Sequence, residues 1–357
     1  MSVSNGASRA RWHHPQVICS TEGNAVNPIG AVLETTDAPA HARGYQRLLD
    51  FAHSHVPGRR CWALEGTGSY GAGLAAFLED AGERVVEVCR PKRPPVRGGH
   101  KTDMLDAIRA AREALATEHV IQPRKRGERE AMRVLLTTRQ GAVHASTAAI
   151  NQLKALIISA PDDLRAELRR LSRSQQVARC AALRDRPALS VEHRMTIRAL
   201  RLTAQGVRHL QAEARELENE LLALVREHAS GLLELLGIGP ITAAQILVSW
   251  SHTGRFRSEA AFASFAGVAS IPASSGLTSK HRLNRGGDRQ LNRAMHTITL
   301  IRMRLDPATK AYVARRVSEG KSPRDAQRCL KRNICRQIFE ILERRNQPNA
   351  EDLAQAA

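Results

Sequence analysis

Cys61-Trp62-Ala63-Leu64-Glu65 is a short apolar run that stops on a carboxylate. A continuous apolar run of this length, bounded by charge and glycine, is consistent with a buried strand. A carboxylate is costly to bury unless it is paired or bound to a metal ion. We therefore expect Glu65 to stand at the carboxyl end of a strand, in a functional position.

Strand and helix signals alternate around this run over the first third of the chain. Short apolar runs bounded by glycine, proline or charge predict further strands, and helical periodicity lies between them. The strands are expected at Val17–Cys19, Ala31–Leu33, Val85–Cys89 and Val120–Ile121, and the helices at Gly44–His53, Gly73–Ala81 and Met104–Ala116. This alternation indicates an α/β domain over residues 1–122.

Two more carboxylates, Asp103 and Asp106, begin the last of these helices. Their spacing allows both side chains to face one side of the helix and converge on a cation. Alternatively, they favour the helix dipole as first-turn carboxylates, with Thr102 as the cap. Together with Glu65 on a very basic chain, these hard oxygen ligands suit Mg²⁺, and two such ions can stabilise an in-line phosphoryl displacement. The set predicts phosphodiester chemistry.

A competing interpretation comes from the glycines of Gly66-Thr-Gly68-Ser-Tyr-Gly71, which follow the expected strand and precede an expected helix. This is the context of a dinucleotide-binding turn, and Glu87 lies about 20 residues downstream, where an acidic residue would bind a ribose. Glu65, however, would bring negative charge close to the pyrophosphate. A nicotinamide-dependent enzyme is therefore a minor alternative.

The segment 123–228 opens with the basic linker Pro123–Gly127, and helical periodicity replaces the strand signals from Glu128 to about His228. One apolar stripe comprises Val143, Ile150, Leu153 and Ile157, and a second comprises Leu210, Ala214, Leu217, Leu221 and Leu224. The second stripe alternates steps of four and three over about two heptads, as in a coiled coil. It can join two chains or pack within one chain as a helical hairpin, and the pattern leaves both open.

The third region, residues 229–346, is expected to be a mainly helical domain, followed by a polar tail at 347–357. It opens with Leu236-Gly-Ile-Gly-Pro240, which is similar to the turn of a helix-hairpin-helix. In such a turn the backbone N–H groups, here those of Gly237 and Gly239, bind phosphates without reading sequence. The alternative is an ordinary tight connection between two helices.

A serine-containing loop follows, with Ser274 and Ser275 before Gly276. After it come the cationic residues Lys280, His281, Arg282, Arg285, Arg289 and Arg293, opposed only by Asp288. The hydroxyls can hydrogen-bond a turn or a DNA phosphate. A more specific interpretation is a serine nucleophile, because attack on phosphorus needs nearby positive charge to stabilise the transition state.

The overall charge favours a nucleic-acid partner. The 357 residues include 54 Lys and Arg against 35 Asp and Glu, a formal charge of +19. When basic side chains neutralise the phosphates of a nucleic acid, counterions are released and binding becomes more favourable. Aromatic residues are only 3% of the chain, too few for a base-stacking platform. The six cysteines form no CxxC pair, which argues against a zinc knuckle.

Nothing in the sequence indicates a membrane partner. No stretch approaches the roughly 20 apolar residues of a membrane helix, and the N-terminus lacks the apolar core of a signal peptide. We therefore expect a cytoplasmic protein.

Taken in order, the Glu65 carboxylate, the Asp103/Asp106 pair, the Gly237–Pro240 turn and the Ser274-Ser275-Gly276 loop resemble bacterial insertion-sequence transposases of the DEDD class. This class includes the Piv-type DNA invertases and the bridge-RNA-guided recombinases. The resemblance runs from about Gly44 to Leu342. It implies an α/β plus all-α protein: an N-terminal RuvC-like domain with an RNase H fold, a helical coiled-coil segment, and a mainly helical C-terminal transposase domain.

The resemblance also implies roles for residues. Glu65, Asp103 and Asp106 would be three of four acidic residues that hold Mg²⁺. Ser275 would be the nucleophile, with Ser274 as the alternative assignment. This serine would form a covalent phosphoserine intermediate with DNA. The implied partners are the DNA of the element ends and target, a structured non-coding guide RNA, and further copies of the chain in a dimer or tetramer.

One position departs from the family pattern. The family's first acidic residue lies on the first strand, but residues 1–21 contain neither Asp nor Glu. Glu22 comes in the turn Ser20–Asn24, after what aligns best as the second strand, and Ser4–His14 has no strand pattern. A nucleic-acid-binding relative without chemistry therefore stays open. A RuvC-type nuclease without serine chemistry is a further alternative, distinguished by whether cleavage leaves protein attached to DNA.

Overall fold

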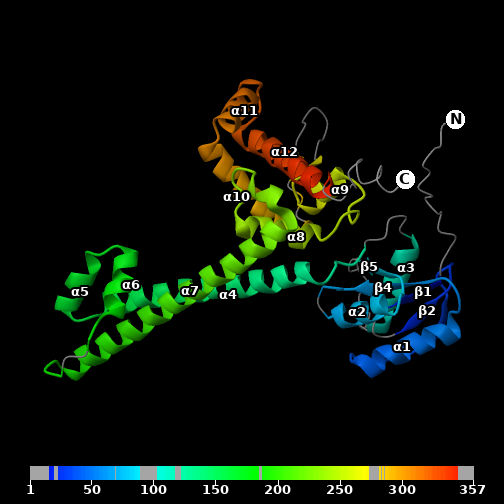
Figure 1. The fold of residues 1–357 in the computed structure, drawn as a ribbon, viewed down its shortest axis with the longest axis horizontal. Coiled ribbons are helices and arrows are strands. Elements are labelled where there is room, and N and C mark those ends of the chain that lie inside the picture. The colour runs from blue at the N-terminus through cyan, green and yellow to red at the C-terminus, as the bar shows by residue number, and fades with distance from the viewer. Residues whose placement is uncertain are drawn as a thin grey trace, which may run out of the picture. The chain divides into compact units, whose positions relative to one another are not determined.

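The computed structural model describes residues 16–19, 23–68, 70–88, 103–116, 122–184, 187–272, 281–282, 284 and 286–344. The chain divides into two compact units, Met1–Arg124 and Lys125–Ala357 (Figure 1). Each unit has hydrophobic cores of its own. The expected strand Val120–Ile121 and the polar tail lie outside the described residues.

The first unit is built on a five-stranded sheet in the order β3-β2-β1-β4-β5. The strands are β1 (Gln16–Cys19), β2 (Asn24–Val26), β3 (Val32–Thr35), β4 (Arg60–Glu65) and β5 (Val85–Val88). β1, β2 and β3 are antiparallel neighbours, whereas β1, β4 and β5 run parallel. The predicted α/β class of this region is confirmed.

The position of the first strand corrects the alignment made from the sequence. Residues 16–19 form β1, the first strand of the described sheet and not its second, because Cys19 pairs with Asn24 of β2 and Val17 pairs with Cys61 of β4. The sequence concealed this hairpin because β2 is only three residues long and includes a buried asparagine, Asn24. β1 carries no carboxylate, and Ser4–His14 lies outside the described residues.

Side chains of β4 alternate between two helical layers. Trp62 and Leu64 pack in one core with α1 (Ala42–His55) and α2 (Ala72–Asp80). Cys61 and Ala63 pack in a second core with α3 (Asp103–Ala116) on the opposite face. A strand covered on both faces needs apolar residues at every position, which explains the continuous apolar run.

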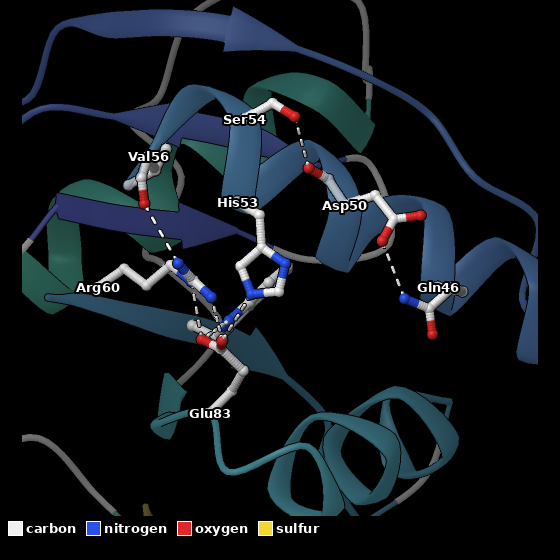
Figure 2. A network of polar contacts seen from close by, with 8 residues as sticks. Gln46, Asp50, His53, Ser54, Val56, Arg60 and Glu83 are labelled. Carbon is white, nitrogen blue, oxygen red and sulfur yellow. Dashed lines mark hydrogen bonds and ion pairs between the residues drawn. The ribbon is translucent and has the colours of Figure 1, made fainter. Parts of the chain in front are cut away.

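An ion pair anchors the amino end of β4. Arg60 and Glu83 are joined by two hydrogen bonds, one from Arg60 Nε to Glu83 Oε2 at 2.9 Å, and their side chains are only 10% and 11% exposed. Trp62 Nε1 donates to the same carboxylate at 2.9 Å. Figure 2 shows Arg60 and His53 directed at Glu83. The pair fixes the start of the strand that ends at Glu65.

Removing this carboxylate is expected to destabilise the first unit. Glu83→Ala leaves the Arg60 guanidinium buried without its counter-ion, which costs about 3–5 kcal/mol. Native-state hydrogen exchange of the β4 amides measures the loss in that unit. Asp80→Asn, at the exposed end of α2, is the control and should change stability by less than about 0.5 kcal/mol. Equal effects of the two substitutions would contradict the assigned role of the pair.

Two long helices dominate the second unit. α4 (Glu128–Ile158) and α7 (Val191–Leu233) pack against each other within the chain. Of the two arrangements that the sequence left open, the chain forms the internal one. Ala214 and Leu221 of the expected stripe are buried, whereas Leu210, Leu217 and Leu224 are half-buried. The buried seam instead continues through Leu200, Ala204, Val207 and Val225.

Shorter helices complete the second unit. α5 (Asp162–Arg169) and α6 (Arg173–Ala181) share a core with the adjoining ends of α4 and α7. α7 has one non-helical residue, Ala229 (φ −164°, ψ 55°), at the domain boundary expected from the sequence. The remaining elements are α8 (Pro240–Trp250), α9 (Glu259–Phe265), β6 (Ile271–Pro272), β7 (His281–Arg282), α10 (Arg289–Leu305), α11 (Pro307–Ser318) and α12 (Pro323–Arg344).

The second unit is mainly helical, as predicted. Its largest core joins α7 and α8 to α10 and α12 around buried side chains such as Phe262 and Met295. No helix in the described ranges combines the length and the apolar character needed to span a bilayer.

Candidate functional site

Glu65 is the last residue of β4, and its side chain is exposed. Alternation along the strand puts it on the face of Cys61 and Ala63, which α3 covers. The chain turns away directly afterwards, because Gly66 adopts a positive φ of 68°. The carboxylate therefore stands at the carboxyl edge of the sheet, as the sequence predicted. It is exposed and not buried, so the cost of burial from which the sequence argued for a functional position does not apply.

The direction of α3 follows from a contact near its other end. Arg112 Nε donates to Gly30 O at 2.9 Å, and Gly30 lies in the turn between β2 and β3. That turn is at the amino edge of β4, because Val26 and Cys61 both pair with Val17. The nine residues from Arg112 back to Asp103 span about 13 Å of helix, which is most of the roughly 17 Å length of the six-residue β4.

Glu65 and the beginning of α3 consequently share one edge and one face of the sheet. Ala107, Ala110 and Ala111 hold the helix against that face. The side chains of Asp103 and Asp106 lie outside the described part of the chain, so their roles remain predictions. Where side chains are described, no three His, Cys, Asp or Glu residues gather as metal ligands.

The glycine turn after β4 has a structural explanation. A Cβ at residue 71 would lie 2.8 Å from Glu65 O, and Gly71 N donates to Gly66 O at 3.1 Å. A dinucleotide-binding sheet is parallel and carries its glycine turn after the first strand. Here β2 runs antiparallel to β1 and the turn follows β4. The nicotinamide alternative therefore loses its structural basis.

The turn before α8 is packed against α10. Gly237 has a φ of 87°, and a Cβ there would lie 3.2 Å from Ile298 O. Gly239 N donates to Thr242 Oγ1 at 3.0 Å, and Arg302 Nε donates to Leu236 O at 2.8 Å. The Gly239 N–H is thus bonded within the chain. Phosphate binding at Gly237 and Gly239 stays a prediction.

The serine loop is carried by a two-stranded antiparallel ribbon. Ile271 of β6 pairs with Arg282 of β7. Residues 273–280, including Ser274, Ser275 and Lys280, lie outside the described residues, as does Arg285. Of the predicted nucleic-acid-binding cations, Arg282, Arg289 and Arg293 have exposed side chains.

Asp288, the carboxylate within this basic run, is engaged in the fold. It caps α10 by accepting from the backbone N–H groups of Gln290 and Leu291 at 2.9 and 3.0 Å. Its other oxygen accepts from Ser249 Oγ at 2.9 Å. Its charge stabilises the amino end of α10, while the three exposed arginines extend into solvent.

Sequence reasoning missed how firmly the ribbon is anchored. Asn284 Nδ2 donates to Ser264 O at 3.1 Å, and Asp288 N donates to Phe265 O at 2.7 Å. At residue 287 a Cβ would lie 2.4 Å from the same Phe265 oxygen. The Gly286-Gly287 pair in an otherwise basic stretch was the available signal for this close approach.

A second feature that the sequence did not reveal is a cavity of about 620 Å³ beside the non-helical residue of α7. Lys125, Arg129, His228, Trp250 and His252 contribute to its lining. Burial lowers the pKa of His252 to about 4, and Lys125 and Arg255 add to this effect by charge repulsion. His252 is therefore neutral near pH 7.

Acidification is expected to weaken the second unit through His252. Between about pH 6.5 and pH 4 the unfolded chain binds a proton at this residue that the folded chain does not, so stability falls as the pH falls. Urea unfolding followed by helical circular dichroism should show a flatter pH profile in His252→Gln. The exposed His209→Gln serves as the control. A wild-type profile in His252→Gln would contradict the assignment.

Comparison with known proteins identifies the family. A transposase model of the IS110 DEDD class matches residues 20–160, and the model described as the IS116/IS110/IS902 transposase family matches residues 229–314. An uncharacterised 42 kDa protein of insertion element IS900 from Mycobacterium paratuberculosis is 27% identical over 338 residues, covering 80% of this chain and 83% of the relative. The chain belongs to the IS110/IS900 family of insertion-sequence transposases.

A further relative of this IS110-family transposase is an uncharacterised 43.6 kDa protein of insertion element IS110 from Streptomyces coelicolor. It is 35% identical over 143 residues, 39% of this chain and 35% of the relative. Family membership implies DNA transposase activity and DNA binding. The sheet belongs to a DEDD domain of the RNase H-like class, which suggests a divalent metal ion.

Proposed function

We propose that this transposase cuts and exchanges DNA strands in a Mg²⁺-dependent reaction in which Ser275 is the nucleophile. The observation that carries the proposal is the common edge and face shared by Glu65 and the beginning of α3. In this proposal Glu65, Asp103 and Asp106 supply oxygen ligands, which suit Mg²⁺. The ion would supply stabilisation of the charge that develops on the phosphate oxygens.

The covalent step is a substitution at phosphorus. Ser275 Oγ loses its proton and forms a bond to the phosphorus of a DNA phosphodiester, while the bond to one deoxyribose oxygen breaks and that oxygen takes a proton. The protein is then joined to DNA through a phosphoserine, and reversal of the step with another strand's hydroxyl completes the exchange. No base is assigned, although His281 is near in sequence.

The exposed arginines support the proposed DNA contact. Three exposed arginines follow the serine loop in the chain. Arg282 lies on β7, and Arg289 and Arg293 lie in the first two turns of α10. Such cations contact phosphates, which position the strand without specifying its sequence. We propose that Gly237, Lys280 and Arg285 add to the same contact surface.

Guide RNA and oligomerisation complete the proposal. A formal charge of +19 with 3% aromatic residues suits a protein that holds nucleic-acid backbones and leaves sequence choice to base pairing. We propose a structured non-coding RNA as the guide. We also propose a dimer or tetramer in which the serine of one protomer meets the acidic residues of another.

One observation favours a second candidate function. β1 carries no carboxylate, so the family's first acidic residue has no counterpart on the described strand. A relative that binds nucleic acid without chemistry is consistent with this departure. The two candidates differ in a single outcome, the formation of a covalent bond to DNA.

The test is a reaction of the full chain with DNA that contains the ends of its own element. Mg²⁺ and RNA transcribed from the element's non-coding flank are each supplied or withheld. A metal-dependent protein–DNA adduct that survives denaturation supports the proposal. No adduct with both supplied favours the non-catalytic candidate, and cleavage without attached protein favours a nuclease of the RuvC type.

A further inference from the structure

A small pocket in the second unit lies between the first turns of α12 and the ends of the β6–β7 ribbon that join the rest of the unit. Its volume is about 220 Å³, and its lining includes Gly267, Ser270, Asn284, Arg324, Arg328 and Lys331. Sites for organic small molecules are usually larger, roughly 300–1,000 Å³. The volume suits a small group such as a phosphate.

Three cations from one face of α12 dominate this pocket. Arg324, Arg328 and Lys331 recur at steps of four and three, so they lie side by side on the helix. Arg328 pairs with Asp325 at 2.9 Å. Within the described ranges no carboxylate contacts Arg324 or Lys331, which leaves the pocket with an excess of positive charge.

Lys331 is the least exposed of these three cations and gives the strongest indication of an anion site. Its side chain is half-buried, and burial together with the charge of Arg328 lowers its pKa. The charge of Lys331 also acts on His296 of α10, whose pKa is lowered by partial desolvation and by this charge. A partly desolvated ammonium beside another cation is unfavourable until an anion approaches.

The pocket also has a functional location. Ser270 directly precedes β6, and Asn284 follows β7 by two residues. Ser270 and Asn284 therefore place the pocket beside the two ends of the ribbon that join the rest of the unit, and Ser270 is five residues before Ser275 in the chain. An anion held here is next to the start of the segment that carries the proposed nucleophile.

We propose that this pocket holds a backbone phosphate of the DNA strand near the cleavage point, gripped by Lys331 and Arg324. The choice of DNA rests on the proposed function. Lys331 and Arg324 are positioning residues that fix the strand and do not take part in the substitution at phosphorus. Because every nucleotide carries the same phosphate, the contact does not discriminate between sequences.

The salt dependence of DNA binding tests this proposal. Each phosphate contact contributes about 0.9 to the slope of log affinity against log salt for duplex DNA. Lys331→Gln and Arg324→Gln should each reduce the slope by about this amount and weaken binding of a short duplex of arbitrary sequence about tenfold. The control is Lys310→Gln, which removes the same charge from an exposed position on α11.

An unchanged slope in Arg324→Gln, an exposed position whose substitution does not disturb the core, would overturn the proposal. An equal fall in Lys310→Gln would do so too, as would a fall seen only with RNA in place of DNA. These measurements need no catalysis. If the proteins bind DNA with the predicted slopes but the wild type forms no adduct, the proposed function is contradicted. The assignment of the pocket then still holds.

Discussion

Ser275→Ala is expected to abolish the covalent protein–DNA adduct and, with it, strand exchange. Without the hydroxyl there is no oxygen to attack phosphorus, and removing a catalytic nucleophile costs roughly 10³-fold or more. The measurement is the fraction of end-labelled DNA that stays attached to protein on a denaturing gel. DNA binding should persist, because the exposed arginines are untouched.

Ser274→Ala is the matched control, since it removes the neighbouring hydroxyl from the same loop. It should leave adduct formation within a few-fold of the wild type. Undiminished adducts from Ser275→Ala, with Ser274 intact, would remove the assignment. Adducts lost only from Ser274→Ala would transfer the role to that residue.

Glu65→Gln is expected to abolish metal-dependent cleavage while leaving the fold unchanged. The amide keeps the size of the side chain but loses the charge that binds a divalent cation. Metal catalysis supplies several kcal/mol of transition-state stabilisation, so the expected loss in rate is roughly 10²–10³-fold. Calorimetric titration with Mg²⁺ should show weaker binding, which gives a readout independent of the reaction.

Glu113→Gln is the control for this prediction, because it removes a carboxylate from the other half of α3. It should bind Mg²⁺ and cleave DNA as the wild type does. Glu65 is exposed, so a change in stability is not expected from its substitution. Wild-type cleavage by Glu65→Gln would show that the acidic site lies elsewhere.

The α/β and helical regions were predictable because their apolar patterns are strong. The continuous run of β4 and the periodicity of α4 and α7 both reflect burial that the sequence must satisfy. The second strand, β2, was missed because it is only three residues long and includes a buried polar residue, Asn24. Such a strand has no pattern that distinguishes it from a turn.

The parts of the candidate site that depend on residues adjacent in the sequence were predictable. The parts that depend on tertiary packing were not. The strand-end position of Glu65 follows from its place after four apolar residues. The direction of α3 depends on the distant contact between Arg112 and Gly30. The pocket on α12 brings together residues more than fifty positions apart, and neither segment alone shows a ligand-binding pattern.

The separate cores of the two units bear on how the chain responds to heat. Multidomain proteins depart from all-or-none melting, so one midpoint does not define their stability. A calorimetric scan should accordingly be analysed as more than one transition. The Glu83→Ala substitution should then lower the midpoint of the transition in which the first unit unfolds. Protonation of His252 should lower the midpoint of the transition in which the second unit unfolds.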